Sequence, residues 1–414
     1  MLHDSPLRTL HEEYIARGLS GARSGKVQAD RPGAATGQRV AAEVHYIPYG
    51  GPGDAEPACE IVAGYAEVEL EYAAIRRGAG VMDSPHRGTL LVTGDLAARR
   101  EFFNRMLTQE LKDLSPGIAR RSFWLNRKGR IEADLLLMEL GDRMLVDVDI
   151  LNAARSAQTL NEFIVAEDVQ IEDASSKFHH IALHGRHALQ TLAAVSGTAA
   201  GTLENAQAGT MNIEGVNAAY ARREQVGEPG LELVIPYEDA ATVWTALLSI
   251  PPQPFPVRPI GWHAFNIARI EAGTPVFNVD FGPTNLPHET GVLRERVSFT
   301  KGCYLGQEVV ARMEHLGRPK QMLVGLRMLE DLLPTSGEQV FSMNEDGSMG
   351  EEIGVVTSST LSPMLGAAPI AFAMIKSAHA DVGREVIVNA EGAQSKAAVS
   401  PLSFWPAQSE QAGG

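Results

Sequence analysis

The chain has 414 residues and a formal net charge of -15 at pH 7, with 44% hydrophobic and 21% charged residues. These values are ordinary for a globular protein of two or three domains, and they exclude wholesale disorder. A strongly acidic protein repels a phosphate backbone, so we expect no direct nucleic-acid interface.

The chain contains two cysteines, Cys59 and Cys303. Two thiols cannot form a disulfide framework or supply the four thiolates that usually hold an iron–sulfur cluster. The first residues lack a basic region followed by an apolar core, and no apolar run approaches the roughly 18 residues of a membrane span. We therefore expect a cytoplasmic protein with no membrane contact, in which any cluster chemistry would require a partner.

The N-terminal part predicts a helix, two loops and a second helix. Ser5 and Pro6 are typical of a helix start, because serine caps free amides and proline suits the first turn. The stretches 21–37 and 49–54 are rich in helix and strand breakers and predict loops. Apolar residues recur at helical spacing over 68–77, which predicts a helix there.

The next part predicts an α+β unit. A short apolar strand is expected at 89–93, and Asp95 is expected to cap the helix that follows. A hairpin is expected at 122–139 and a strand at 143–150. In that last strand Asp147 and Asp149 alternate with valines, so we expect both acids to face solvent. The order of strand, helix, hairpin and strand favours an α+β fold.

His180 and His184 would share one face of a strand. Their spacing does not match a zinc motif and no cysteine accompanies them, so we expect no metal site.

The run K-G-C-Y-L-G-Q-E occupies residues 301–308. The alternating pattern at 297–300 predicts a strand before it, and apolar residues at helical spacing predict a helix after it. Gln307 and Glu308 would lie in the first helical turn, where acceptors suit unpaired amides. The helix start and Lys301 would both lower the pKa of the Cys303 thiol, which makes Cys303 a candidate reactive thiolate. The alternative is a small buried side chain that fills a tight turn.

After residue 319 the pattern changes to short strands separated by glycine and proline. Five apolar segments between residues 322 and 389 alternate with turns. Regular strand spacing of this kind predicts a small β-barrel.

The run at 301–308 resembles the signature of the folate-binding YgfZ family, a branch of the glycine-cleavage T-protein (aminomethyltransferase) superfamily. This resemblance implies three lobes around a central channel that accepts tetrahydrofolate. It implies a folate-binding region of two interleaved α+β subdomains at 1–318, a barrel domain at 319–407 and a disordered tail at 408–414.

Three further segments resemble this superfamily. Residues 126–135 are similar to N-x-x-G-G-x-x-D-D-L and keep Asp134, with Ala133 in place of the other aspartate. Residues 226–232 are similar to T-G-E-x-G-x-E, which implies that Glu228 faces the pterin; a β-turn with solvated acids is the alternative. Residues 80–88 resemble a folate-site loop in which His86 and Arg87 could contact a carboxylate, or could form a solvated turn.

Residues 269–275 are similar to R-x-E-x-G-x-P, and Phe265 replaces an arginine of the T-proteins. A buried network of Arg269 and Glu271 is the structural alternative, because charges in a core are normally paired. The resemblance implies that Cys303 is the reactive residue. The folate-binding residues that it implies are Asp134, Glu228, Arg269, Lys301, Tyr304 and Gln307.

Three functions follow from this resemblance. The first is a tetrahydrofolate-binding factor that supports assembly or maintenance of iron–sulfur enzymes through client or assembly proteins, and affects tRNA modification only through such an enzyme. The second is a folate-dependent aminomethyltransferase or methyltransferase, which Asp134 and Glu228 favour and Ala133 and Phe265 oppose. The third is a binding module without chemistry.

Overall fold

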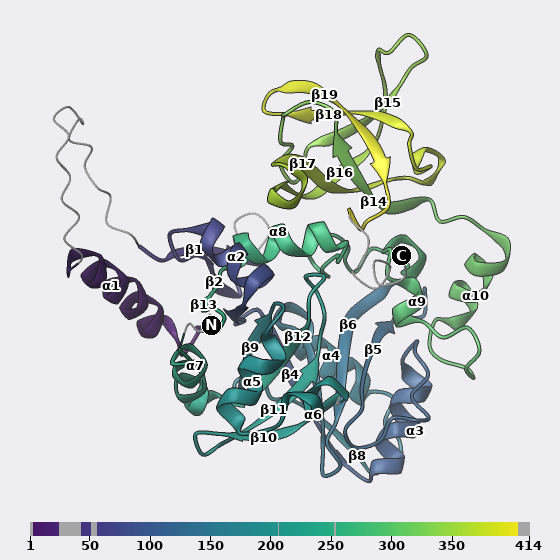
Figure 1. Ribbon diagram of the computed structural model, residues 1–414. Coiled ribbons are helices and arrows are strands. Elements are labelled where there is room, and N and C mark those ends of the chain that lie inside the picture. The colour runs from purple at the N-terminus through teal and green to yellow at the C-terminus, as the bar shows by residue number, and fades with distance from the viewer. Residues whose placement is uncertain (1–2, 25–42, 51–55, 206, 252–253, 405–414) are drawn as a thin grey trace.

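The computed structural model describes residues 3–24, 43–50, 56–205, 207–251 and 254–404. Two packed β-sheets form the body of the molecule, and a closed β-barrel forms a separate lobe above them (Figure 1). The tail expected at 408–414 lies outside the described residues, as do residues 25–37 and 51–54 of the two expected loops.

The N-terminal elements pack against the body. Helix α1 (Arg8–Ser24) follows the expected start, where the amide of Leu7 donates to Ser5 Oγ at 3.1 Å. Strands β1 (His45–Tyr49) and β2 (Cys59–Gly64) form an antiparallel pair. Tyr49 is therefore a buried strand residue, and the loop expected from residue 49 begins later. Helix α2 (Val68–Arg77) has the predicted bounds.

The first sheet has six strands. Its core includes Trp244 and is closed on the outer side by α1 and by helices α5 (Ala188–Ser196), α6 (Ala200–Asn205) and α7 (Ala240–Leu248). A single 3-10 turn, η1 (Tyr237–Asp239), precedes α7. The strands, in spatial order, are β10 (Ala208–Ile213), β11 (Val216–Arg222), β12 (Gly230–Pro236), β9 (Phe178–His184), β3 (Ala79–Asp83) and β13 (Val257–Pro259).

The second sheet has five strands. Helices α3 (Leu96–Met106) and α4 (Ile150–Asn161) cover its outer face. The Asp95 side chain accepts from the amide of Ala98 at 2.9 Å, which confirms the expected cap of α3. The strands, in spatial order, are β5 (Ala119–Leu125), β6 (Ile131–Glu139), β7 (Met144–Asp149), β4 (Arg87–Gly94) and β8 (Val169–Asp173).

The inner faces of the two sheets pack on each other. Leu145 of β7 joins Ala221 and Val234 of the other sheet in one apolar cluster. Asp147 and Asp149 follow Leu145 along the same face of β7, and their exposed fractions are 0% and 1%. The prediction that these acids face solvent is wrong, because a second sheet covers the face that a lone sheet would leave open to water.

The chain then leaves the sheets and runs to the barrel. Helix α8 (Trp262–Ala272) is followed by η2 (Pro287–Glu289), α9 (Leu293–Arg296) and α10 (Gln307–Leu316). The strand expected at 297–300 is absent: Val297 caps α9, and no strand pairs with residues 298–300 among the described residues. The predicted helix after the 301–308 run is confirmed.

The barrel closes through six antiparallel strands, and α8 packs against two of them, β16 and β17. This confirms the expected α+β fold with a small C-terminal barrel (Figure 1). Among the described residues no helix combines the length and apolar character needed to cross a membrane. The strands, in spatial order, are β14 (Gln321–Met328), β17 (Ala368–Lys376), β16 (Met349–Ser362), β15 (Gln339–Met343), β18 (Glu385–Ala390) and β19 (Ala393–Ser400), with the turns η3 (Pro363–Leu365) and η4 (Ser377–His379).

Candidate functional site

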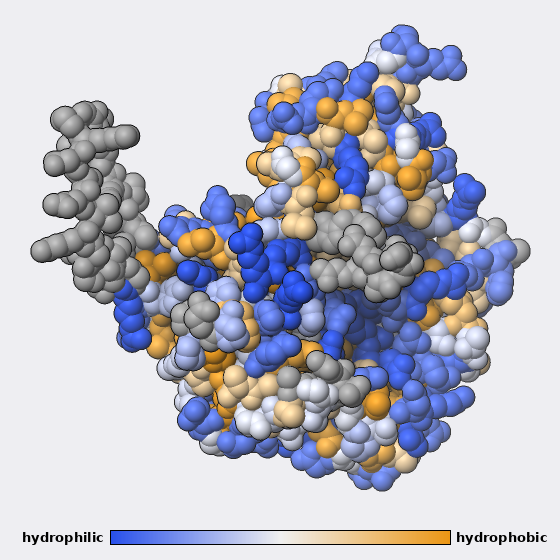
Figure 2. Space-filling view, viewed as in Figure 1, coloured by the Kyte–Doolittle hydropathy of each residue, from blue (hydrophilic) through white to orange (hydrophobic). Residues whose placement is uncertain are grey.

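A narrow crevice lies between the two sheets and under α8. Its free space is about 20 Å³, which is roughly the room that one water molecule needs. On the outer surface, Figure 2 shows a hollowed and mostly hydrophilic region below the barrel. The polar residues of the crevice are Ser84, His86, Arg87, His184, Arg223, Gln225 and Glu232, and its aromatic residues are Trp262 and Phe265.

The chain enters the crevice where it changes sheets. Strand β3 belongs to the six-stranded sheet and β4 to the five-stranded sheet, so the turn between them spans both. Within this turn the amide of Arg87 donates to the carbonyl of Ser84 at 3.0 Å. His86 and Arg87 are only 8% and 7% exposed, so the alternative of a solvated turn is wrong.

A buried ion-pair network joins the two sheets beside the crevice. The Arg87 Nε–H donates to Asp147 Oδ1 at 2.6 Å, and Arg223 donates to Asp147 Oδ2 and, at 3.3 Å, to Glu232 Oε2. His180 Nδ1 lies 3.0 Å from Glu232 Oε1. Burial alone would raise the pKa of Asp147, but the guanidinium groups of Arg87 and Arg223 outweigh it and hold this pKa well below its usual range.

Three buried nitrogen atoms of the crevice have no hydrogen-bond partner among the described residues. They are Nδ1 of His86, Nδ1 of His184 and Nε of Arg223. Burial lowers the pKa of His86 to about 3, with Arg87 and Arg223 adding to the effect, and burial lowers the pKa of His184 to about 4. Both imidazoles are therefore neutral at pH 7. Unpaired buried polar atoms are uncommon and indicate a place where a ligand can complete the hydrogen bonding.

Two aromatic rings of α8 close the crevice. The ring centroids of Trp262 and Phe265 are 5.5 Å apart, and Phe265 lies 5.1 Å from the ring of His184. The amide of Gly261, at the start of α8, donates to Glu71 Oε2 at 2.7 Å and fixes where the helix begins. Phe265, which stands in place of an arginine of the T-proteins, therefore gives the crevice an apolar wall.

Asp134 lies on the inner face of β6 beside the network. Its carboxylate accepts from Arg121 Nη2 at 2.9 Å and from Arg296 Nε at 3.0 Å. Burial alone would raise the pKa of Asp134, but Arg296 and Arg121 outweigh it and the pKa is lowered. Asp134 is thus an ionised carboxylate that is already paired. Ala133 points to the opposite face and packs in the core under α3 and α4.

The second acid of the 226–232 segment, and not the first, reaches the crevice. Glu228 lies half-buried in the turn between β11 and β12 and is not among the lining residues. Burial raises its pKa, and Arg76 and Arg186 oppose that effect. Glu232 lies on β12, is 2% exposed and lines the crevice.

The loop that carries Cys303 packs on the turn of the β5–β6 hairpin. Gly306 has a φ of 83°, and a Cβ atom there would lie 2.8 Å from the carbonyl oxygen of Asn126. Tyr304 is buried in an apolar cluster, and Gln307 begins α10 as expected. Cys303 itself is exposed, so the alternative that it fills a buried turn is wrong. Cys303 is also not among the residues that line the crevice.

Lys301 anchors this loop to the end of α3. Its Nζ donates to the carbonyl oxygens of Asn104, Leu107 and Gln109 at 2.6, 2.7 and 2.8 Å. Burial lowers the pKa of Lys301 to about 8. None of the described contacts of Lys301 is with Cys303. The ammonium group therefore binds carbonyl groups at the end of α3 and does not contact the thiol.

Arg269 holds α8 to the barrel. Its Nη1 donates to Asp280 Oδ2 at 2.7 Å and its Nη2 donates to Ser358 Oγ at 2.7 Å. Glu271 pairs separately, with Arg76 at 2.6 Å. The buried network that was the structural alternative is therefore present, although the two residues have different partners and Arg269 does not line the crevice.

Asp147, Arg223 and Trp262 are site residues that the sequence does not predict. Strand alternation predicts Asp147 in solvent, and neither Arg223 nor Trp262 lies in a recognised motif. One feature of the sequence indicates a buried ionic site: the acids at 147 and 149 share one face of an otherwise apolar strand. If that face is buried, the acids need cationic partners.

Comparisons with known proteins cover most of the chain. Residues 59–301 match the GCVT N-terminal domain, and residues 321–405 match the glycine cleavage T-protein C-terminal barrel domain. An aminomethyltransferase of Geobacillus kaustophilus is 30% identical over 352 residues, which are 84% of this chain and 92% of that protein. An aminomethyltransferase of Listeria monocytogenes is 28% identical over 350 residues, or 82% of this chain and 90% of that protein.

The fold also matches a solved structure. The glycine cleavage system aminomethyltransferase T from Bartonella henselae superposes with a TM-score of 0.76 at 24% identity, over 88% of this chain and 95% of that chain. The two domain matches follow one another along the sequence and cover most of it. This chain therefore belongs to the glycine-cleavage T-protein family.

Proposed function

We propose that the protein binds tetrahydrofolate in the crevice between its two sheets and takes part in one-carbon transfer of the aminomethyltransferase type. The observation that carries the proposal is the set of unpaired buried nitrogens on His86, His184 and Arg223, in a crevice with a wall of Trp262 and Phe265. The relatives named aminomethyltransferase, which align with this chain over about nine-tenths of their length, support the reaction type.

The chemistry of the crevice suits a pterin. A pterin is a planar ring with donors and acceptors along its edge. Glu232 supplies a carboxylate acceptor, the neutral imidazoles of His86 and His184 each supply one donor and one acceptor, and the rings of α8 supply apolar contact. The free space of about 20 Å³ is smaller than a pterin. Binding therefore requires the lining side chains to move, and α8 carries the two aromatic ones.

The bound folate would supply the amine nitrogen that accepts a one-carbon unit. The residues of this chain would bind and orient the ring. Asp134, kept ionised by Arg121 and Arg296, would hold negative charge next to the crevice without taking a proton near neutral pH. The aligned position Ala133 offers no second carboxylate, which distinguishes this chain from the superfamily pattern.

A second candidate function is support of iron–sulfur enzymes in the manner of the YgfZ branch. Exposure of Cys303 within the K-G-C-Y-L-G-Q-E run favours it, because a thiol that acts on a partner protein must be accessible. In this function the client or assembly protein would dock at the 301–308 loop, and a cytoplasmic location would follow. Ala133 and Phe265 favour this candidate over the transferase.

One assay separates the two candidates. Purified protein is incubated with tetrahydrofolate and an aminomethylated lipoyl carrier protein, and ammonia release is measured. The transferase proposal predicts release that depends on folate and falls in Glu232→Gln but not in Cys303→Ala. Absence of release, together with lower iron–sulfur enzyme activities in a gene knockout that Cys303→Ala fails to restore, would replace the first candidate by the second.

A further inference from the structure

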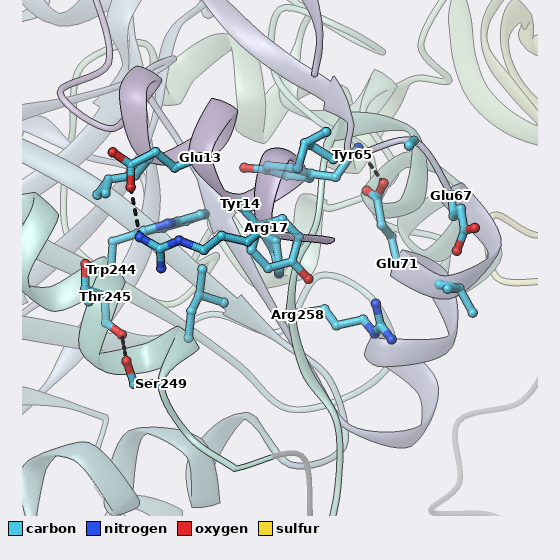
Figure 3. A pocket seen from close by; sticks show the side chains of 16 residues that line it. Glu13, Tyr14, Arg17, Tyr65, Glu67, Glu71, Trp244, Thr245, Ser249 and Arg258 are labelled. Carbon is cyan, nitrogen blue, oxygen red and sulfur yellow. Dashed lines mark hydrogen bonds and ion pairs between the residues drawn. The ribbon is translucent and has the colours of Figure 1, made fainter. Parts of the chain in front are cut away.

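A second cavity, separate from the crevice, lies between α1, α2 and α7. Its volume is about 610 Å³, within the range of 300–1,000 Å³ that small-molecule sites occupy. Figure 3 shows Tyr14 in the middle of this cavity, between Trp244 and Arg258. Within the part of the chain that the structure describes, no residue lines both this cavity and the crevice.

A buried hydrogen-bond network holds Tyr65 in the aromatic wall of the cavity. The Tyr65 hydroxyl lies 2.8 Å from His11 Nδ1, and His11 Nε2 lies 2.8 Å from Asp83 Oδ2 on β3. The rings of Tyr14 and Tyr65 meet edge to face at 5.9 Å. Leu248 of α7 adds an aliphatic surface. A wall held by a buried network loses little side-chain entropy when a flat ring packs on it.

The cavity also carries one cation suited to an anionic ligand. Arg258 lies on β13, which pairs in parallel with β3 and so holds the residue in place. Its guanidinium is partly buried and lies within reach of the Tyr14 hydroxyl, where it opposes the rise in the Tyr14 pKa that burial causes. No ion pair to Arg258 occurs among the described residues. Among the other charged residues of the wall, Arg17 pairs with Glu13 and Glu71 accepts two backbone amides, whereas the side chain of Glu67 makes no cap hydrogen bond at the start of α2.

We propose that this cavity binds a small planar aromatic carboxylate, with its ring against Tyr14 and Leu248 and its carboxylate on Arg258. The guanidinium fork matches a carboxylate in a bidentate geometry, and the apolar wall accommodates the ring. The volume admits a bicyclic ring with a short acidic side chain. This site is independent of the proposed function in the crevice.

The test uses the full chain and two probes of the same shape. Indole-3-acetate and its neutral counterpart indole-3-acetamide are titrated by calorimetry into wild type, Arg258→Gln and Arg77→Gln. Arg77 is an exposed arginine of α2 outside the cavity and serves as the matched control. We expect the acid to bind with one site per chain. Affinity should fall about tenfold to a hundredfold for the amide and for Arg258→Gln, and stay unchanged in Arg77→Gln.

Comparison of the two probes on wild type keeps the test valid if Arg258→Gln fails to fold. Equal affinity for acid and amide, or no binding of the acid at millimolar concentration, would overturn the proposal. Saturation with tetrahydrofolate should leave binding of the acid unchanged, and competition would instead assign the acid to the crevice. Leu70 lies at the cavity rim. If the protein forms a dimer and Leu70→Asp dissociates it, this face binds a second copy of the chain, and the proposal is overturned.

Discussion

The Nε–H of Arg87 donates to Oδ1 of Asp147 across 2.6 Å and joins the first residue of β4 to the middle of β7. Both side chains are buried where the two sheets meet. The contact joins the turn that changes sheets to the ion-pair network beside the crevice. It therefore links the stability of the body to the geometry of the proposed ligand site.

Asp147→Asn should destabilise the protein. The change removes the ionic partner of Arg87 and leaves Arg223 with Glu232 as its remaining ion pair, and breaking a buried ion pair in this way costs about 3–5 kcal/mol. Urea denaturation followed by circular dichroism measures the loss. Asp142→Asn, an exposed aspartate whose side chain is 69% accessible, is the control and should change little. A loss below about 1 kcal/mol in Asp147→Asn would mean that the network is less buried in solution than in the structure.

The buried histidines should make stability fall in mild acid. The folded pKa of His86 is about 3 and its ordinary value is 6.5, so between these values the unfolded chain binds the proton that the folded chain excludes. Stability is therefore full above pH 6.5 and declines as the pH falls below it. A shift of one unit corresponds to about 1.4 kcal/mol, so His86 alone should contribute a loss of about 2 kcal/mol between pH 6.5 and 5.

Urea denaturation at pH 7, 6 and 5 tests this dependence. His86→Gln should flatten the decline, and His315→Gln, at an exposed position of α10, should not. An unchanged decline in His86→Gln would show that His86 reaches water in the folded state.

The two cysteines should differ sharply in alkylation. Cys303 is exposed, whereas Cys59 has an exposed fraction of 0% and burial, with Asp149 adding, raises its thiol pKa to about 12. Iodoacetamide at neutral pH, read by mass spectrometry, should therefore label Cys303 in the folded protein and Cys59 only in denaturant. Faster labelling of Cys59 would contradict the packing of β1 on β2. Protection of Cys303 by tetrahydrofolate would indicate that the folate site extends to the 301–308 loop.

Lys301→Met should loosen the same loop without changing the chemistry of the thiol. It removes three hydrogen bonds from the ammonium group to carbonyl groups at the end of α3. A hydrogen bond to a charged group contributes about 1.5–3 kcal/mol to the free energy of unfolding. We expect a clear loss of thermal stability and faster proteolysis of the 301–308 loop. Lys128→Met, an exposed lysine of the β5–β6 turn, is the control. Unaltered stability would exclude the anchoring role of Lys301.

Local patterns in the sequence predicted the elements that depend on local physics. The helix at 68–77 follows from amphipathic spacing, the cap of α3 from Asp95, and the barrel from regular strand spacing. The stacking of one sheet on another is not local, and therefore the burial of Asp147 was missed. The strand predicted at 297–300 failed for a related reason, because β-branched residues form a strand only where a neighbour pairs with them.

The candidate site was predicted in part. The segments that carry Arg87 and Glu232 were identified, because each resembles a segment of the T-protein superfamily. The partners of Lys301 lie nearly 200 residues earlier in the chain, so its proximity to Cys303 in sequence suggested a role that its contacts do not support. Arg223 follows no motif, and its partners Asp147 and Glu232 lie on different sheets, so only the packing of the two sheets brings them together.

The most direct measurement is the affinity of tetrahydrofolate, determined by calorimetry for wild type, Glu232→Gln and Glu228→Gln. Glu345→Gln on the barrel is the control, and thermal melts confirm that each variant folds. Folate binding in the crevice predicts one site per chain, with affinity about tenfold to a hundredfold weaker in Glu232→Gln and nearly unchanged in Glu228→Gln. Absence of binding in wild type, or a loss in Glu228→Gln with none in Glu232→Gln, would contradict a folate site between the two sheets.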